Sequence, residues 1–262
     1  MRVLVVLALI SAAFAESNRI IGGTITNIEN YPFMTSMQYL WNHGFYHGCG
    51  GTLITTLAVI STGTCFNRNL IASNWRARVG SAALMTGGTP IPVSRLILHH
   101  NFNPTMMTSN IAMIRLTTAA TLSNTIKIAR IAGPNYALPD NLRVYIAGWG
   151  TTTENFGGLS NELRHVDVRI VNHALCTDRY ADLKSQPGFE YIPPVWPDNV
   201  CTGLLNIGGQ DACSGDLGGP VVHQGDIVIG VSDWAFTCGD PYYPRVNVRV
   251  SSYIQWISQN AS

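Results

Sequence analysis

Charged residues are scarce in this chain: Asp, Glu, Lys and Arg make up 12% of its 262 residues, and the formal net charge is +1. There is no basic stripe of the kind that binds nucleic acid, and there is no acidic tail. Hydrophobic residues reach 46%, which is ample for a sizeable core in a chain that can form one domain. We therefore expect a globular protein that does not bind nucleic acid.

Long apolar runs are also lacking, because none reaches the roughly 20 residues that a membrane-spanning helix needs. The apolar run Val3–Ile10 follows Arg2 and precedes the small-x-small sequence Ala13-Phe14-Ala15. A positive end, a short apolar run and such a cleavage site are together typical of a secretory signal peptide. Residues 1–15 are therefore predicted to direct secretion of an extracellular protein that is not attached to a membrane.

Metal-binding motifs are absent from the sequence. The six cysteines include no Cys-x-x-Cys pair, there is no His-Glu-x-x-His sequence, and the segment 79–98 has no Asp or Glu. Zinc and calcium sites are built from such residues. We expect no metal and no cofactor. Six cysteines in a secreted chain instead indicate three disulfides, although their number alone leaves 15 connectivities open.

Alternating and short apolar segments predict β-strands at 75–80, 92–98, 163–171, 221–222 and 227–231. In the segment 163–171 the alternation directs Val166, Val168 and Ile170 inward. Val250, Ile254 and Ile257 repeat at helical spacing and predict a C-terminal helix. The proline-rich segment 187–197 is expected to be a surface loop, because proline removes ladder donors.

The stretch 209–220 reads Gly-Gln-Asp-Ala-Cys-Ser-Gly-Asp-Leu-Gly-Gly-Pro, which resembles the nucleophile loop of the trypsin-like serine proteases. Arg19-Ile20-Ile21-Gly22-Gly23 resembles the activation site of that family, and Gly148-Trp149-Gly150 resembles one of its strand ends. The resemblance covers Ile20 to about Gln259, and the secreted trypsins of insect guts are the most similar group.

This resemblance implies an all-β fold of two packed six-stranded antiparallel β-barrels with a C-terminal α-helix. The trypsin-like domain would span residues 20–262 and follow an activation pro-segment at 16–19. The resemblance also implies three disulfides, which are Cys49–Cys65, Cys176–Cys201 and Cys213–Cys238.

All three catalytic positions of the family are substituted in this chain. Leu217 replaces the nucleophilic serine, Thr64 the histidine and Asn110 the aspartate. Leucine has no lone pair, a threonine hydroxyl is not basic near neutral pH, and an amide holds an imidazole in the wrong tautomer. Losing the serine or the histidine alone lowers the turnover of a triad protease by about 10⁶. We therefore expect no catalytic residues and no proteolytic activity.

Other functional positions of the family are kept. Cleavage after Arg19 would free the amine of Ile20 to pair with Asp216, because a buried carboxylate needs a buried cation. The alternative is that Arg19 is exposed and never cut. Gly215 and Leu217 carry the two backbone N–H groups of the oxyanion hole, whose geometry does not require serine.

The specificity pocket combines a kept residue with two substitutions. Asp211 matches the carboxylate that binds Arg or Lys in trypsins, whereas Ala235 and Arg245 replace glycines. Arginine is long and permanently charged, and a desolvated unpaired carboxylate costs several kcal/mol. We therefore predict that Arg245 enters the pocket and pairs with Asp211. The alternative is an Arg245 side chain in solvent and an open pocket.

Two further residues belong to the neighbourhood of the site. Asp233 stands where the family has serine, and we expect it either to hydrogen-bond Thr64 or Asn110 or to be exposed. His47 matches a histidine that can hydrogen-bond the carboxylate at the Asp216 position in uncleaved relatives, and an ordinary core or surface histidine is an equal alternative.

The sequence therefore predicts a secreted, monomeric protease homologue without catalytic activity. Its expected partner is a protein, with the chain acting as a decoy for protease inhibitors or as a regulator of active proteases. Two alternatives remain: a weak trypsin-like endopeptidase, and a bulk secreted structural protein.

Overall fold

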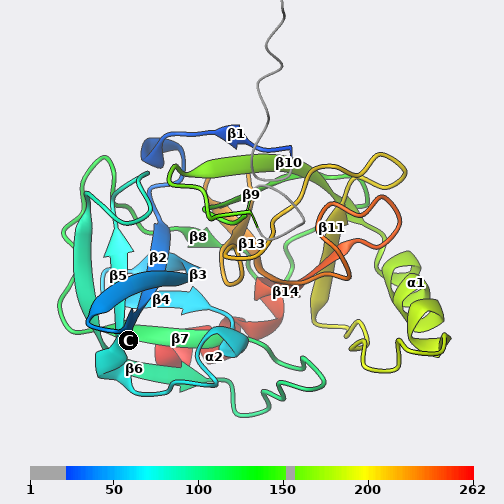
Figure 1. The fold of residues 1–262 in the computed structure, drawn as a ribbon, viewed down its shortest axis with the longest axis horizontal. Coiled ribbons are helices and arrows are strands. Elements are labelled where there is room, and N and C mark those ends of the chain that lie inside the picture. Colours follow the sequence, from blue (N-terminus) through cyan, green and yellow to red (C-terminus); the bar gives the residue numbers. More distant parts are fainter. Residues whose placement is uncertain (1–21, 152–156) are drawn as a thin grey trace, which may run out of the picture.

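A computed structural model describes residues 22–151 and 157–262, and its strands form two closed six-stranded antiparallel barrels (Figure 1). This arrangement confirms the predicted fold class. The predicted signal peptide at 1–15, the pro-segment at 16–19 and Ile20 lie outside the described residues.

The first barrel closes through pairing of its first strand with its fourth in chain order. Trp75, Ala77 and Val79 are buried while Arg76 and Arg78 between them are half-buried, so the strand that carries them turns alternate side chains to the core. In spatial order the strands are β2 (Met34–Trp41), β3 (Gly44–Thr55), β4 (Ala58–Ser61), β7 (Ala112–Leu116), β6 (Thr89–Leu98) and β5 (Trp75–Val79).

The second barrel closes through pairing of β9 (Arg143–Gly148) with both β10 (Arg164–Val171) and β12 (Pro220–His223). Val166, Val168 and Ile170 are buried in its core, as the alternation predicts. Two short strands, β1 (Thr24–Ile25) and β8 (Arg130–Ile131), add to its sheet. In spatial order the barrel strands are β9 (Arg143–Gly148), β10 (Arg164–Val171), β11 (Asn199–Gly203), β14 (Arg245–Arg249), β13 (Ile227–Trp234) and β12 (Pro220–His223).

The predicted C-terminal helix is present and packs on the first barrel (Figure 1). It starts as a 3₁₀ turn, η4 (Val250–Tyr253), and continues as α2 (Ile254–Asn260), with Val250 and Ile257 buried. Three more 3₁₀ turns are η1 (Ile28–Asn30), η2 (Gly63–Cys65) and η3 (Ala72–Asn74).

A second α-helix, α1 (His173–Ser185), was not among the elements predicted from the sequence. The side chain of Asn172 caps it by accepting a hydrogen bond from the N–H of Leu175. Only Cys176, Tyr180 and Leu183 are buried, and they lie four and three residues apart on one face. The segment 187–197 that follows contains no helix or strand, as predicted.

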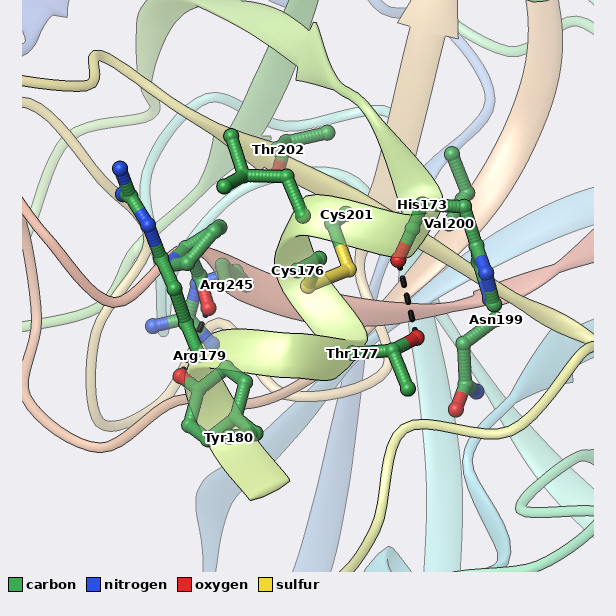
Figure 2. Close-up of a disulfide and its surroundings, with 12 residues drawn as sticks. His173, Cys176, Thr177, Arg179, Tyr180, Asn199, Val200, Cys201, Thr202 and Arg245 are labelled. Atoms are coloured by element: carbon green, nitrogen blue, oxygen red, sulfur yellow. Dashed lines mark hydrogen bonds between the residues drawn. A yellow bond between two sulfur atoms is a disulfide. The ribbon is translucent and has the colours of Figure 1, made fainter. Parts of the chain in front are cut away.

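The three disulfides are the pairs that the resemblance implies: Cys49–Cys65, Cys176–Cys201 and Cys213–Cys238. Figure 2 shows the bridge that ties α1 to β11, with Tyr180 on the same helix. In the described part of the chain, no helix is long and apolar enough to cross a membrane.

Candidate functional site

The candidate site lies where the two barrels meet. The first barrel contributes η2 and the residues just before β7, and the second contributes the loop 209–219 and the ends of β13 and β14. The barrels are joined here by a hydrogen bond of 2.8 Å from the N–H of Gly50 to the carbonyl of Leu217. This junction brings together residues that are distant in sequence.

Thr64 and Asn110, two of the three positions predicted to replace catalytic residues of the family, are in direct contact. The amide nitrogen of Asn110 donates to the hydroxyl oxygen of Thr64 at 2.8 Å and to Oδ1 of Asp233 at 2.7 Å. The amide oxygen of Asn110 accepts the backbone N–H of Thr64 at 2.9 Å. The predicted contact of Asp233 is therefore with Asn110, and the three residues form a closed network.

This network has no group that can activate a nucleophile. Besides Asn110, the one partner of the Thr64 hydroxyl among the described residues is the weakly accepting Sδ of Met107, at 3.8 Å. Asn110 and Asp233 are 1% and 2% exposed. Burial raises the pKa of Asp233 well above its ordinary value, although the hydrogen bond from Asn110 opposes the shift. The carboxyl of Asp233 is separated from Thr64 by an amide, which cannot relay a proton.

Leu217 is followed in its loop by a position, Gly218, that only glycine can occupy without a collision. Gly218 has φ of +83°, and a Cβ atom there would collide with the hydroxyl of Ser61 and the carbonyl of Gly50. The N–H of Gly218 donates to the carbonyl of Ser232 at 2.8 Å. The backbone of the nucleophile loop is therefore held tightly against both barrels, while the side chain of Leu217 is only half-buried.

Asp216 is buried below this loop, with 1% of its surface exposed. Its carboxylate accepts the N–H groups of Gly150 at 2.6 Å and Cys213 at 2.9 Å. A Cβ atom at Gly148 or Gly150 would collide with that carboxylate, which explains the Gly-Trp-Gly sequence. Burial raises the pKa of Asp216 to about 6, although the two N–H donors and Arg245 lower it.

His47 contacts Gly215 and does not contact Asp216. Its Nε2 lies 2.8 Å from the carbonyl of Gly215, and its Nδ1 lies 2.8 Å from the hydroxyl of Ser36. A neutral ring that donates from Nε2 and accepts at Nδ1 satisfies both partners. Burial lowers the pKa of His47 to about 4, against the opposing hydrogen bond to Gly215. The histidine is thus a neutral support of the nucleophile loop.

Arg245 enters the specificity pocket and pairs with Asp211, as the sequence predicts. Its Nε lies 2.7 Å from Oδ1 of Asp211, and both side chains are 5% exposed. The guanidinium also donates to the carbonyls of Ala212 at 2.5 Å and Asp233 at 3.2 Å. Burial lowers the pKa of Arg245, but the charge and hydrogen bond of Asp211 outweigh burial, so the pKa is raised overall.

A cleft of about 420 Å³ remains above this ion pair. Its side walls are the segment 213–217 on one side and the segment 234–238 on the other, which the disulfide Cys213–Cys238 joins. Ala235, the other pocket position predicted to be substituted, lies on the wall and is half-buried. Arg245 lines the same cleft, so it forms part of the boundary.

The two N–H groups assigned to the oxyanion hole border this cleft. Gly215 and Leu217 both line it. Within the described part of the chain, neither of their N–H groups donates a hydrogen bond. Two open backbone donors beside a cleft can donate hydrogen bonds to a carbonyl oxygen of a bound peptide.

Sequence reasoning missed Tyr180, which supports the wall of the cleft from α1. Its hydroxyl donates to the carbonyl of Pro244 at 2.7 Å and accepts the N–H of Phe236 at 3.2 Å. Its ring packs edge-on against Trp234, with 4.8 Å between ring centroids. The helical spacing of Cys176, Tyr180 and Leu183 was the available signal.

No group of three metal-ligating side chains occurs among residues 22–151 and 157–262. Arg19 and Ile20, the two activation residues, lie outside these ranges. The described site thus consists of the hydrogen-bonded network of Thr64, Asn110 and Asp233, a buried Asp216, and a pocket whose carboxylate is already paired.

Comparison with known proteins agrees with this architecture. The sequence profile of the family described as Trypsin matches residues 20–257. The chain is 36% identical to Trypsin CFT-1 of Choristoneura fumiferana over 256 residues, which cover 97% of this chain and 96% of the relative. It is 36% identical to the alkaline A trypsin of Manduca sexta, over 97% and 95% of the two chains. It is 32% identical to a trypsin of Phaedon cochleariae, over 97% and 96%.

Two barrels with the site at their junction, three disulfides and a full-length match to the family profile lead to one assignment. The chain belongs to the trypsin-like family of serine proteases.

Proposed function

We propose that this chain is a secreted trypsin homologue that does not catalyse proteolysis and acts by binding another protein. The observation that carries the proposal is the closed network of Thr64, Asn110 and Asp233. Among residues 22–151 and 157–262 no base lies within hydrogen-bonding distance of the Thr64 hydroxyl, and Leu217 supplies no nucleophile. The partner is expected to be a protease inhibitor, for which the chain is a decoy, or an active protease that it regulates.

The preserved frame supports a binding role over simple decay. Three disulfides, a tightly held nucleophile loop and an open cleft of about 420 Å³ are all present. A cleft of this volume is within the range of ligand pockets in proteins. The disulfides and the insect trypsin relatives also support an extracellular location.

The first test is hydrolysis of peptide amides, with one substrate carrying arginine and another carrying leucine before the scissile bond. We expect no turnover above that of a mock purification. A trace of authentic trypsin serves as the positive control. Hydrolysis that copurifies with the protein and persists with an inhibitor of authentic trypsin would support the weak endopeptidase and refute the proposal.

The second test is binding by calorimetry, with protein protease inhibitors and with active trypsins as the two partners. We expect saturable binding of one partner molecule per chain in at least one class. Absence of saturable binding in both classes would favour a bulk secreted structural protein and would count against the proposal. The two tests are independent, since a protein can lack activity and also lack a partner.

A further inference from the structure

The Asp211 carboxylate of the pocket is already paired within the chain. Oδ1 of Asp211 accepts Arg245, and Oδ2 accepts the N–H of Gly239 at 3.1 Å. Two further guanidinium N–H groups donate to the carbonyls of Ala212 and Asp233. Because both oxygens of the Asp211 carboxylate already have partners, an incoming ligand finds no free anion at the floor of the cleft.

A cationic side chain entering this cleft would meet Arg245 before it met Asp211. Arg245 lines the cleft, whereas Asp211 lies behind it, outside the lining. Like charges in contact without an intervening anion repel each other, and this repulsion discriminates against wrong partners. The carboxylate that is on the lining, that of Asp233, is 2% exposed and accepts a hydrogen bond from Asn110. Its second oxygen, Oδ2, has no partner but is buried out of reach of solvent.

Half-buried apolar side chains form one part of the accessible wall of the cleft, beside the exposed hydroxyl residues of the lining. Leu217, Trp234, Ala235 and Phe236 all line it and are half-buried, so each presents part of its side chain at the surface. Tyr180 fixes the outer wall by packing on Trp234 and by holding the N–H of Phe236. Apolar surface of this kind, rigidly placed in a concave site, favours an uncharged side chain.

The backbone donors beside the cleft indicate that the ligand is a peptide. The N–H groups of Gly215 and Leu217 donate no hydrogen bond within the described part of the chain. A polypeptide loop has a carbonyl next to each side chain and can place both in the cleft at once. A free hydrocarbon or lipid tail would leave these donors unsatisfied.

From these contacts we propose that the cleft binds a protein loop through a large, uncharged apolar side chain, and that Arg245 excludes lysine and arginine. This inference rests on the proposed non-catalytic binding function and specifies the chemistry of the partner. It also assigns a different role to Asp211, which in this chain anchors Arg245 and does not select a basic ligand.

The experiment uses two forms of one small protease inhibitor that binds active trypsin through a rigid loop. The forms are identical except for leucine or lysine at the loop residue that enters the trypsin pocket. We expect the leucine form to bind the wild-type chain at least about tenfold more tightly, which corresponds to the burial of one aliphatic side chain. Both affinities are measured by calorimetry at the same ionic strength.

The decisive variant is Arg245→Gly, which frees Asp211 and opens the floor of the cleft. We expect the preference to reverse toward the lysine form. The matched control is Arg130→Gly, because Arg130 is an exposed arginine that pairs with Asp226 near the opposite end of β13. This control should keep the preference for the leucine form.

A second variant keeps the test decisive if Arg245→Gly does not fold. Phe236→Ser removes part of the apolar wall without touching the buried ion pair, and it should weaken the leucine form several-fold while leaving the lysine form unchanged. A wild-type chain that prefers lysine, or that binds neither form, overturns the inference. If neither form binds but an active trypsin does, the inference fails and the proposed function stands. Hydrolysis of the loop would instead refute the proposed function.

Discussion

The buried ion pair of Arg245 and Asp211 should be indispensable to the stability of this domain. Arg245→Met keeps much of the side-chain volume but removes the charge and every guanidinium donor. Asp211 then retains only the N–H of Gly239, and the carbonyls of Ala212 and Asp233 lose their donor. The perturbation leaves a carboxylate that is 5% exposed without a cation.

The expected magnitude follows from that burial. Removing one partner of a buried ion pair typically destabilises a protein by about 3–5 kcal/mol. A domain has only about 5–15 kcal/mol of unfolding free energy in total. Arg245→Met should therefore lower the unfolding free energy by about 4 kcal/mol, and Asp211→Asn by a similar amount. The double variant should lose less than the sum by about 2 kcal/mol, because neither charge is left alone.

The assay is urea denaturation near neutral pH with the disulfides intact. Tryptophan fluorescence and far-ultraviolet circular dichroism must give the same transition, which justifies a two-state treatment. Arg130→Met is the matched control, since its ion pair with Asp226 is exposed on both sides, and we expect no measurable change.

Two results would refute this reasoning. One is a loss of less than about 1 kcal/mol in Arg245→Met, which would mean that the ion pair is not buried in solution. The other is strict additivity of the two single variants, which would mean that the two charges do not interact.

Three other predictions concern pH, cleavage and a disulfide. The pKa of His47 is lowered to about 4, so the unfolded chain binds the extra proton first as the pH falls from about 6.5 to 4, and the wild-type protein loses stability in that window. The difference in unfolding free energy between wild type and His47→Gln should therefore shrink by about 2–3 kcal/mol between pH 7.5 and 4.5 in urea titrations. A difference that stays constant with pH contradicts the assignment. The pKa of Asp216 is raised to about 6, so its contribution to stability declines as the pH rises from about 4 to 6. Cleavage after Arg19 should pair the new amine with Asp216, lower that pKa and abolish the decline. Identical profiles of stability against pH for cleaved and uncleaved protein would exclude the pairing. Replacing Cys176 and Cys201 by alanine opens a loop with a sequence separation of 25 and should lower the unfolding free energy by about 3–4 kcal/mol, so an unchanged melting temperature would show that α1 needs no covalent tie.

Much of the fold was predictable, because strand alternation and family motifs are local features of the sequence. The inward set Val166, Val168 and Ile170 occupies the core as expected. The helix α1 was not predicted, since only three of its residues are buried and Leu175 is 38% exposed. Its position depends on Tyr180 packing against Trp234, which is 54 residues further along the chain by their numbering.

The candidate site, like the fold, was predictable only in part. The identities of Thr64, Asn110 and Leu217 are enough to predict that the chemistry of the triad is lost, because reactivity belongs to the side chain itself. The partners of these residues were less certain. Asp233 had two candidate partners and an exposed alternative, and the folded chain places it on Asn110. His47 similarly had a candidate partner in Asp216, and the fold places it on Gly215.

The sequence by itself determined the family, the disulfide pairs implied by it, the side chains Thr64, Asn110 and Leu217 at the predicted catalytic positions, and the opposite charges of Arg245 and Asp211. Only the tertiary structure decided that Arg245 also donates to the carbonyls of Ala212 and Asp233 and borders a cleft that contains half-buried apolar side chains. The physical reason is that charge is a property of one residue. Burial and hydrogen-bond satisfaction instead depend on atoms that two closed barrels bring together from distant parts of the chain.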